Sequence, residues 1–350
     1  MLTTMSETAP KIASREPTMR DVGAVAGVSL KTVSRVVNRE AGVSAELVTR
    51  VNAAVELLGY RHNLTASSLR RGDGRTATIG LVLEDVANPF SSALYRAIER
   101  IALRRGTQVL AGSSDEDPTR VAELLFTFDQ RRVDGLIVAQ AGRGDGGLGR
   151  DLRRGQPIVF VDRPGPNIND DHVITNNRGA VAEIVQHLVN GGHQRIAYIG
   201  DMPLIWTAAE RHTGFLEGLA TARVTLFDRY VRMDVRGADA AAAAATDLLA
   251  MQTPPTAIVT GQNLLTIGVV RALQALELQE TVALVGFDDI PMADCLTPRL
   301  SAMVQDVEEL GRTAATILFD RIAGDDGPPK RLVLPSRLVA RGSGEISPTR

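Results

Sequence analysis

The chain has 350 residues, 44% hydrophobic and 23% charged, as expected of a globular protein with two or three domains. Its single cysteine, Cys295, excludes an internal disulfide framework, and no apolar run reaches the roughly 18 residues of a membrane span, so we expect a cytoplasmic protein. Residues 1–75 carry eleven Lys and Arg against seven Asp and Glu, a net charge of +4, whereas the remainder carries −6. A basic head on an acidic body favours a polyanion as the partner of the head.

Residues 18–62 are expected to form an all-α domain, after a polar lead-in at 1–17 that lacks periodicity and is expected to be disordered. Thr18 and Asp21 resemble a capping box at the start of a first helix, and Ser44 is placed to cap a third. Between these two helices, a turn at 27–29 leads into a second helix. This order predicts a helix-turn-helix domain, whose second helix enters the DNA major groove.

The second helix has two different faces. Val33, Val36 and Val37 recur at helical spacing on one side, and residues with hydrogen-bond donors occupy the opposite side. An ordinary amphipathic surface helix has the same pattern, but the neighbouring helices favour a recognition helix. The predicted DNA-binding residues of this region are Ser29, Leu30, Lys31, Thr32, Ser34, Arg35 and Asn38.

Residues 63–75 are expected to form a hinge. The segment is polar, and it carries Arg70 and Arg71 beside one large apolar residue, Leu69. A plain linker has this composition, but an isolated leucine next to two arginines is also suited to wedge into a minor groove while the arginines hold phosphates.

From Ala77 onward, apolar strand patterns alternate with helical patterns. TATIGLVLED, DGLIVAQA, PIVFVD, RIAYIGD and VALVGFDD are typical of buried parallel strands, and the repeated alternation predicts helices on both faces of each sheet. There are too many units for one sheet, so we expect two α/β subdomains side by side. Loops at the carboxyl ends of their strands would line a cleft between them.

Polar and aromatic residues follow several of these strands. Three aspartates each lie just beyond an apolar strand, an arginine lies in a later helix, and a phenylalanine and the only tryptophan supply aromatic faces. Each aspartate alone also fits a helix N-cap, but three in one layer favour a binding site for a sugar or a similar polar metabolite. These candidates are Asp85, Phe90, Asp162, Trp206, Arg211 and Asp288, with Trp206 just before the helix of Arg211.

A glycine-rich segment, Gly142 to Gly147, matches the dinucleotide-binding pattern G-x-G-x-x-G after a strand, with Asp162 20 residues beyond Gly142. Its position deep in the α/β region and the short helix after it argue against a nicotinamide cofactor. The five histidines show no metal-ligand spacing with Cys295 or with each other. We therefore expect no cofactor and no metal.

Taken in order, these motifs resemble the LacI/GalR family of bacterial transcription regulators from about Thr18 to about Arg341. The most specific stretch is MRDVGAVAGVSLKTVSRVVN followed by GVSAELVTRVNAAVELLGYRHN. The hinge NLTASSLR and the body motifs IGLVLEDVANPF, SSDEDP, RRVDGLIV, FVDR, NNRGA, GHQRIAYIG and VGFDDI are also similar to the family.

The resemblance implies a homodimer that binds a palindromic DNA operator and an effector in a body similar to periplasmic sugar-binding proteins. It implies that Leu30 and Lys31 choose the operator and that Arg35 is the shared arginine. In the hinge, it implies DNA contacts by Asn63, Ala66, Leu69 and Arg70. In the cleft, it places effector contacts at Phe90, Asp162, Arg211, Gln262 and Asp288, with Asp85 close by.

The chain departs from the family pattern at Gln262-Asn263, where many members have Asn-Asp and so carry a carboxylate that this chain lacks, and at His62, where proline is common. No leucine heptad follows Arg341, so the resemblance supports a dimer. The expected body spans 76–341, with one subdomain at 76–174 and 304–324, the other at 175–303 and 330–341, and a flexible tail at 342–350.

The expected fold is thus an N-terminal helix-turn-helix domain and a body of two doubly wound parallel-sheet subdomains. The expected function is a repressor with a sugar-like effector and no membrane partner. Two alternatives remain: an activator, and a nicotinamide-binding or other small-molecule-binding α/β enzyme with a helical dimerisation head.

Overall fold

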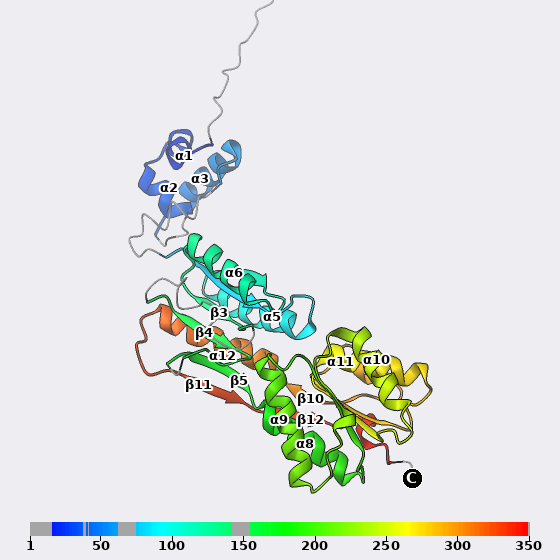
Figure 1. Ribbon diagram of the computed structural model, residues 1–350. Helices are drawn as coiled ribbons and strands as arrows, with labels where there is room; N and C mark the ends of the chain where they lie inside the picture. Colours follow the sequence, from blue (N-terminus) through cyan, green and yellow to red (C-terminus); the bar gives the residue numbers. More distant parts are fainter. Residues whose placement is uncertain are drawn as a thin grey trace, which may run out of the picture. The chain divides into compact units, whose positions relative to one another are not determined.

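The computed structural model describes residues 16–37, 40, 42–61, 75–141, 155–167 and 169–348. The chain divides into two compact units, residues 1–74 and 75–350, and each is described by itself (Figure 1). Within the described ranges, no helix is long and apolar enough to cross a lipid bilayer.

The first unit is a three-helix domain with a core of small branched side chains. Its helices are α1 (Met19–Ala26), α2 (Leu30–Val37) and α3 (Ala45–Leu58). Val22, Val33 and Val51, one from each helix, are completely buried against each other. The valine-rich faces that the sequence predicts are therefore the faces that pack, and the opposite side of α2 is left for solvent.

The helix starts follow the capping pattern of the sequence. Asp21 accepts a hydrogen bond of 2.7 Å from the backbone N–H of Thr18, and the Ser44 hydroxyl accepts one of 3.5 Å from Leu47 N–H. These bonds use backbone donors that a helix start would otherwise leave without partners. Both predicted starts are confirmed.

The second unit contains two six-stranded sheets, which define a first lobe and a second lobe. The first sheet has the order β11-β5-β4-β3-β1-β2, with β1 (Thr78–Leu83), β2 (Gln108–Ser113), β3 (Leu136–Val138), β4 (Ile158–Val161), β5 (Asp171–Thr175) and β11 (Arg331–Leu334). The second has the order β12-β10-β9-β8-β6-β7, with β6 (Ile196–Ile199), β7 (Val231–Arg232), β8 (Ala257–Thr260), β9 (Ala283–Phe287), β10 (Ser301–Gln305) and β12 (Ser336–Val339). Only β12 runs antiparallel to its neighbour among the described pairs.

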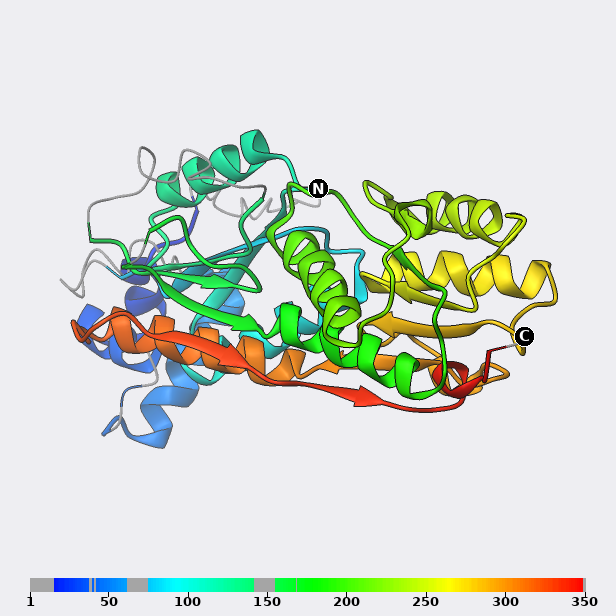
Figure 2. The same ribbon diagram turned by 60° about the horizontal axis from the view of Figure 1, so that its bottom comes forward.

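Helices cover both faces of each sheet, which confirms the doubly wound α/β prediction. The first lobe has α5 (Pro89–Arg104) and α12 (Val307–Ile322) on one face and α6 (Pro118–Gln130) on the other. The second lobe has α8 (Asn177–Asn190) and α9 (Trp206–Thr221) on one face and α10 (Gly237–Leu249) and α11 (Asn263–Ala275) on the other (Figure 2). The described part of this unit also has three short 3-10 helices: η1 (Asp228–Tyr230), η2 (Ala293–Cys295) and η3 (Ser343–Glu345).

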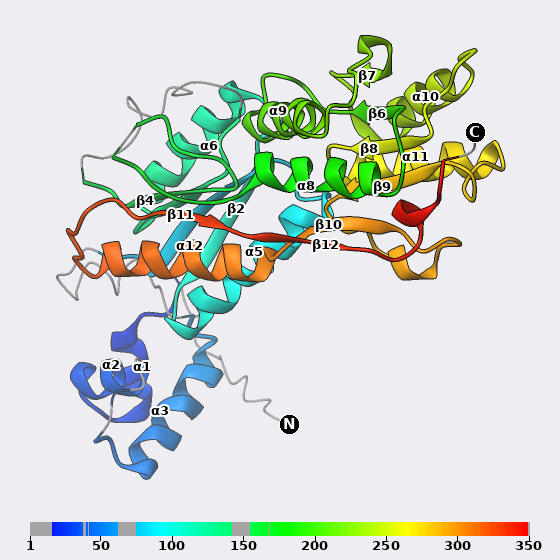
Figure 3. The ribbon, with the colours of Figure 1, turned by 90° about the horizontal axis from the view of Figure 1, so that it is seen from below.

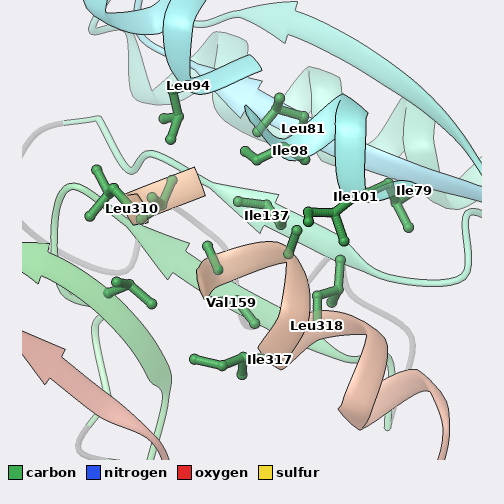
Figure 4. Packing of buried hydrophobic residues seen from close by; sticks show 14 of the residues in the cluster. Ile79, Leu81, Leu94, Ile98, Ile101, Ile137, Val159, Leu310, Ile317 and Leu318 are labelled. Carbon is green, nitrogen blue, oxygen red and sulfur yellow. The ribbon is translucent and has the colours of Figure 1, made fainter. Parts of the chain in front are cut away.

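The core of the first lobe shows why its strands read as continuous apolar runs. Ile79 and Leu81 of β1 are completely buried, and they lie among Ile98 of α5 and Leu310 and Leu318 of α12 (Figure 4). A parallel sheet between two helix layers exposes neither face to water. Apolar residues therefore occupy both faces of its strands and do not alternate with polar ones.

The chain crosses between the lobes three times, and two of the predicted crossing points are displaced. The sequence predicts a crossing into the first lobe at residue 304. Because β10 stays in the second sheet through Gln305, the chain crosses after that residue. Residues 331–334 were expected in the second lobe but form β11, which pairs in parallel with β5 of the first. Only β12 joins the second sheet, as the long red segment passing both lobes shows (Figure 3).

The segment from Gly342 to Pro348, expected to be a flexible tail, packs on the second lobe. The Ser343 hydroxyl donates a 2.6 Å bond to Leu284 O, and Glu345 accepts a 2.8 Å bond from the Ser301 hydroxyl. Buried polar partners of this kind hold a segment in place regardless of its Gly, Ser and Pro content, so the tail prediction is wrong for these residues.

Candidate functional site

Helix α2 presents a polar surface on the first unit. Lys31 is exposed, Leu30 keeps 40% of its surface exposed, and the Ser29 hydroxyl accepts a 3.1 Å bond from Thr32 N–H at the helix start. Arg35 forms an ion pair of 3.5 Å with Glu40. Ser34 lies on the same helix, half-buried. A face with long cationic and hydroxyl side chains on a rigid helix is suited to phosphate and base contacts in a DNA groove.

The turn before α2 is braced by a residue outside the sequence prediction. Gly27 adopts a left-handed φ of 63°, which glycine reaches without a steric penalty. Nη2 of Arg50, on α3, donates to Ala26 O at 2.7 Å and to Gly27 O at 3.3 Å. The guanidinium thereby satisfies carbonyls at the end of α1 and ties α3 to the turn that leads into α2, so the start of the α2 surface is held in place.

Several predicted DNA contacts lie outside the described residues. These are Asn38 and the residues of the predicted hinge, Asn63, Ala66, Leu69 and Arg70. The glycine-rich segment from Gly142 to Gly147 also lies outside them.

The second unit holds a cavity of about 270 Å³ between the two lobes, at the carboxyl ends of the strands of both sheets. Six of the seven predicted effector contacts line it: Asp85, Phe90, Asp162, Arg211, Gln262 and Asp288. Residues from positions 84 to 305 thus meet at one place, as the strand-end argument requires.

Trp206 is the exception among the predicted contacts. It is the first residue of α9 and not, as expected, a residue before that helix. Its neighbours Ile205 and Thr207 line the cavity, but its own side chain does not. Successive residues of a helix point about 100° apart, so Thr207 can face the cavity while Trp206 beside it does not line it.

Two of the aspartates occupy equivalent places in the two lobes. Asp162 follows β4 and Asp288 follows β9, and both adopt left-handed φ angles, 67° and 66°. Asp115 and Glu116, after β2, also have positive φ angles of 51° and 63°. Non-glycine residues reach this region at a cost of about 1–3 kcal/mol each, and such residues cluster at functional sites. The cavity rim is therefore strained where its carboxylates are presented.

The wall from the second lobe is organised around Arg211, on α9. Its Nε donates to Asn177 Oδ1 at 2.6 Å and its Nη1 to Gly261 O at 2.8 Å. The guanidinium carbon lies 3.8 Å from the ring centroid of Phe287, and Nη1 lies 3.8 Å from Asp288 Oδ2. Neutral acceptors and an aromatic ring thus fix this cation, and Nη2 takes no part in these bonds.

The wall from the first lobe is organised around Arg163, which is only 2% exposed. Glu116 accepts two hydrogen bonds from it, 2.6 Å from Nη2 and 2.8 Å from Nη1. Glu84 accepts a 3.0 Å bond from Nη2, and Asp162 Oδ2 lies 3.4 Å from Nε. Three carboxyl groups therefore surround one guanidinium, which we call the Arg163 cage.

Burial dominates the electrostatics of both strand-end aspartates. It raises the pKa of Asp162, against the lowering effect of Arg163 and Arg211. It also raises the pKa of Asp288, against Arg211 and a hydrogen bond from Gln305 Nε2 of 2.6 Å. Opposite charges on Arg163 and Arg211 thus offset part of the desolvation cost of each carboxylate.

A buried hydrogen bond joins the lobes beside the cavity. Asn263 Nδ2, at the start of α11, donates to Asn88 Oδ1, at the start of α5, over 2.8 Å. Both residues are buried, and the Asn88 oxygen also accepts a 2.9 Å bond from Phe90 N–H as a helix cap. Asn263 therefore makes an amide bridge between the lobes in this chain.

Further lining residues lie outside the sequence prediction: Glu84, Asn88, Asp115, Glu116, Arg163, Asp201, Asn263 and Gln305. A usable signal existed for two of them. Glu84 and Arg163 are the sequence neighbours of Asp85 and Asp162 at the same strand ends. Reading every polar residue after a strand, and not one per strand, finds them.

Comparison with known families gives two matches. A model described as "Bacterial regulatory proteins, lacI family" matches residues 18–63, and one described as "Periplasmic binding protein-like domain" matches residues 185–344. The ribose operon repressor of Escherichia coli (strain K12) is 33% identical over 333 residues, which cover 93% of this chain and 99% of that protein. The regulator KdgR of Bacillus subtilis (strain 168) is 28% identical over 331 residues, 93% of this chain and 97% of that protein.

Solved structures agree. The transcriptional regulator CelR in complex with cellobiose is 30% identical, with a TM-score of 0.69 over 94% of this chain and 100% of that chain. The Lac repressor bound to ONPG in its repressed state is 26% identical, with a TM-score of 0.82 over 94% of this chain and 100% of that chain.

Proposed function

This chain belongs to the lacI family of bacterial regulatory proteins, and we propose on that premise that it is a repressor that binds a palindromic operator as a homodimer and responds to an uncharged sugar. It is a transcription regulator with a DNA-binding domain and an effector-binding body, and not an enzyme. The observation that carries the proposal is the joint presence of a pre-organised, donor-rich α2 face and a polar cavity between the lobes.

Operator recognition is assigned to α2. Lys31 and Leu30 lie at its leading, exposed end, where base edges are met first, and Arg35 lies one turn later. One such helix reads one half-site, so a palindrome is read by two copies of the chain. The hinge contacts at Asn63, Ala66, Leu69 and Arg70 and the contact at Asn38 complete the proposed surface.

The effector class is argued from the size and charge of the cavity. Its volume of about 270 Å³ lies near the lower end of small-molecule sites, about 300–1,000 Å³, and fits a monosaccharide better than a larger ligand. Seven carboxyl groups line it against three arginines. A phosphate or carboxylate on the ligand would add to the existing excess of negative charge. The hydroxyl groups of a neutral sugar would instead donate hydrogen bonds to the carboxylates of the wall. Phe90 supplies an apolar face for a sugar ring.

Arg35→Ala tests the DNA-binding assignment. Both partners of the Arg35–Glu40 pair are partly exposed, so the fold should survive, while operator affinity falls by about 1–3 kcal/mol, roughly 5- to 150-fold. Operator fragments would first be selected from genomic DNA, and affinity then measured by gel shift at fixed salt. Arg131→Ala, which removes an exposed cation from the body, is the matched control. Unchanged affinity in Arg35→Ala contradicts the assignment.

Effector class and direction of control need two further measurements. A thermal-shift panel of neutral sugars, sugar acids and sugar phosphates should give stabilisation only with neutral sugars. A response confined to the anionic ligands contradicts the charge argument. Transcription in vitro from the mapped promoter should fall when the protein is added, whereas a rise would make it an activator.

A further inference from the structure

Two polar residues lie side by side on the second-lobe wall of the cavity. The strands β6 and β8 are parallel neighbours, with Ile199 beside Thr260 at their carboxyl ends. Asp201 and Gln262 each follow two residues later, and both line the cavity. Gln262 Nε2 donates to Asp201 Oδ2 over 2.8 Å. The register of the two strands thus brings a carboxylate and an amide together at one place on the wall.

The start of α11 fixes the orientation of the Gln262 amide. Its Oε1 accepts a 3.0 Å bond from Leu264 N–H, because Gln262 is the N-cap of that helix. The hydrogen-bond partners of an amide decide which end is oxygen and which is nitrogen. Since the cap needs the oxygen, the NH₂ group is turned toward Asp201. It carries two hydrogens, and the bond to Asp201 is the one bond that it makes within the described residues.

The Asp201 carboxylate is held by neutral groups and keeps unused acceptor capacity. Its Oδ1 accepts a 2.7 Å bond from Met202 N–H, and its Oδ2 accepts the bond from Gln262. In the part of the chain that the structure describes, these are the hydrogen bonds of the carboxylate, whereas Asp288 on the same wall lies 3.8 Å from Arg211. A carboxylate has about four lone-pair positions, so about half of them stay available on a half-buried side chain that lines the cavity.

An amide hydrogen next to a carboxylate oxygen suits a hydroxyl group. A hydroxyl donates one hydrogen bond and accepts others, so one hydroxyl can donate to Asp201 and accept from Gln262. We propose that this pair recognises one hydroxyl group of the effector and thereby selects among neutral sugars, with Asp201 as a binding residue additional to those assigned above. The inference rests on the neutral-sugar effector of the proposed function. An ether oxygen or a hydrogen atom at this place gives the carboxylate no donor.

The test starts from the sugar that the wild type binds most tightly. Calorimetry of the full-length protein would rank neutral pentoses and hexoses, with D-ribose, D-xylose, D-glucose and D-galactose among them. The mono-deoxy analogues of the best sugar are then measured in the same way. At least one analogue should bind about 10- to 150-fold more weakly, the range expected for a hydrogen bond to a charged group. If no neutral sugar binds the wild type, the proposed effector class fails, and this proposal fails with it.

Asp201→Ala should remove the discrimination against one of these analogues. The parent sugar and that analogue should bind within about twofold of each other, because the carboxylate that distinguishes them is absent. Discrimination against the other analogues should persist, since it arises elsewhere in the cavity. Asp201→Asn, which keeps the shape of the side chain, should reduce the same discrimination if the alanine variant does not fold. Asp247→Ala, on an exposed position of α10, is the matched control. Survival of every discrimination in both Asp201 variants overturns the proposal.

Gln262→Asn tests whether the two residues act as a pair. Asparagine can still cap α11, but its side chain is one methylene shorter and should not reach Asp201 from that position. The same discrimination should therefore fall by roughly 2- to 10-fold, the range of a neutral hydrogen bond. Thermal melts of the variants separate this from a structural role. A lower Tm with full discrimination would mean that the bond between the side chains only stabilises the lobe, and the pairing would be wrong.

Discussion

The two lobes have the same sheet-and-helix architecture but present very different walls to the cavity. The first lobe contributes five carboxyl groups and one arginine, a formal charge of −4. The second contributes two carboxyl groups and two arginines, a formal charge of zero. One fold, used twice, thus supplies a charged half-site and a neutral half-site, and only the side chains at the strand ends distinguish them.

The same difference appears in how each lobe holds its central cation. Arg163 depends on the carboxyl groups of Glu116, Glu84 and Asp162. Arg211 depends mainly on an amide oxygen, a backbone carbonyl and an aromatic face. Removing a cation held by acids leaves several buried carboxylates without their nearest cation. Removing one held mainly by neutral groups leaves hydrogen-bond acceptors without partners and, at Arg211, deprives Asp288 of a cation at 3.8 Å.

The largest expected effect follows from removing the two cations separately. Arg163→Met should destabilise the body by about 3–5 kcal/mol, because it leaves buried carboxylates without their guanidinium. Arg211→Met should cost less, since the nearest acid, Asp288, keeps its bond from Gln305. Urea unfolding of the full-length variants, followed by circular dichroism, measures both. Equal losses would show that the difference between the walls has no energetic consequence.

A lower pH provides the control for that comparison. Protonation of the cage acids removes the charges that Arg163 neutralises, so the gap between the two variants should narrow on acidification. If the difference in stability between the two variants does not depend on pH, its cause would be a difference in the packing that is lost at the two positions.

How far the sequence predicts this site depends on the kind of residue. Asp85, Asp162 and Asp288 are predictable because each ends an apolar run, and parallel strands bring such ends together. The Arg163 cage is not predictable in this way. Glu116 and Glu84 come from the ends of different strands, and their pairing with one guanidinium depends on the tertiary structure. Sequence neighbours at a strand end give no information on which of them turns inward.

The boundaries of helices, strands and lobes are the other features that the sequence predicts poorly. Trp206 is the first residue of α9 and not a residue before it, and it does not line the cavity. β11 was assigned to the wrong lobe because Leu332 and Val333, 39% and 58% exposed, mark an edge strand that carries no signal of which sheet it joins. The helix-turn-helix domain is different: its contacts are local, so caps, glycine turn and valine spacing predict it from the sequence.

An intermediate loss of stability is expected when the hydrogen bond between the two lobes is removed. Asn263→Asp replaces the amide donor with an oxygen that faces Asn88 Oδ1, which the Phe90 N–H bond keeps in place. Loss of a buried bond and apposition of two acceptors should cost about 1–3 kcal/mol. Thermal unfolding measures it, and Asn263→Ser, which retains a shorter donor, is the control. If Asn263→Asp is as stable as wild type, the amide bridge does not couple the lobes.

The smallest effect is expected for an ion pair of the same chemistry outside the cavity. Arg178 of α8 pairs with Glu217 of α9 through two of its guanidinium nitrogens, Nε and Nη2. About half of each side chain is exposed, 48% and 47%. The hydrogen bond from Arg178 lowers the pKa of Glu217, so any stability it contributes is present at neutral pH and is lost only on acidification.

Glu217→Gln should therefore leave the Tm at neutral pH close to the wild-type value, because water and salt screen an exposed pair. The measurement is a thermal melt of both proteins at low and at high salt, in parallel with Arg163→Met. A loss comparable to that of Arg163→Met would mean that burial does not decide the strength of these pairs. A negligible loss would show that burial of the Arg163 cage, and not the type of residues that pair, sets the energetic difference between the lobes.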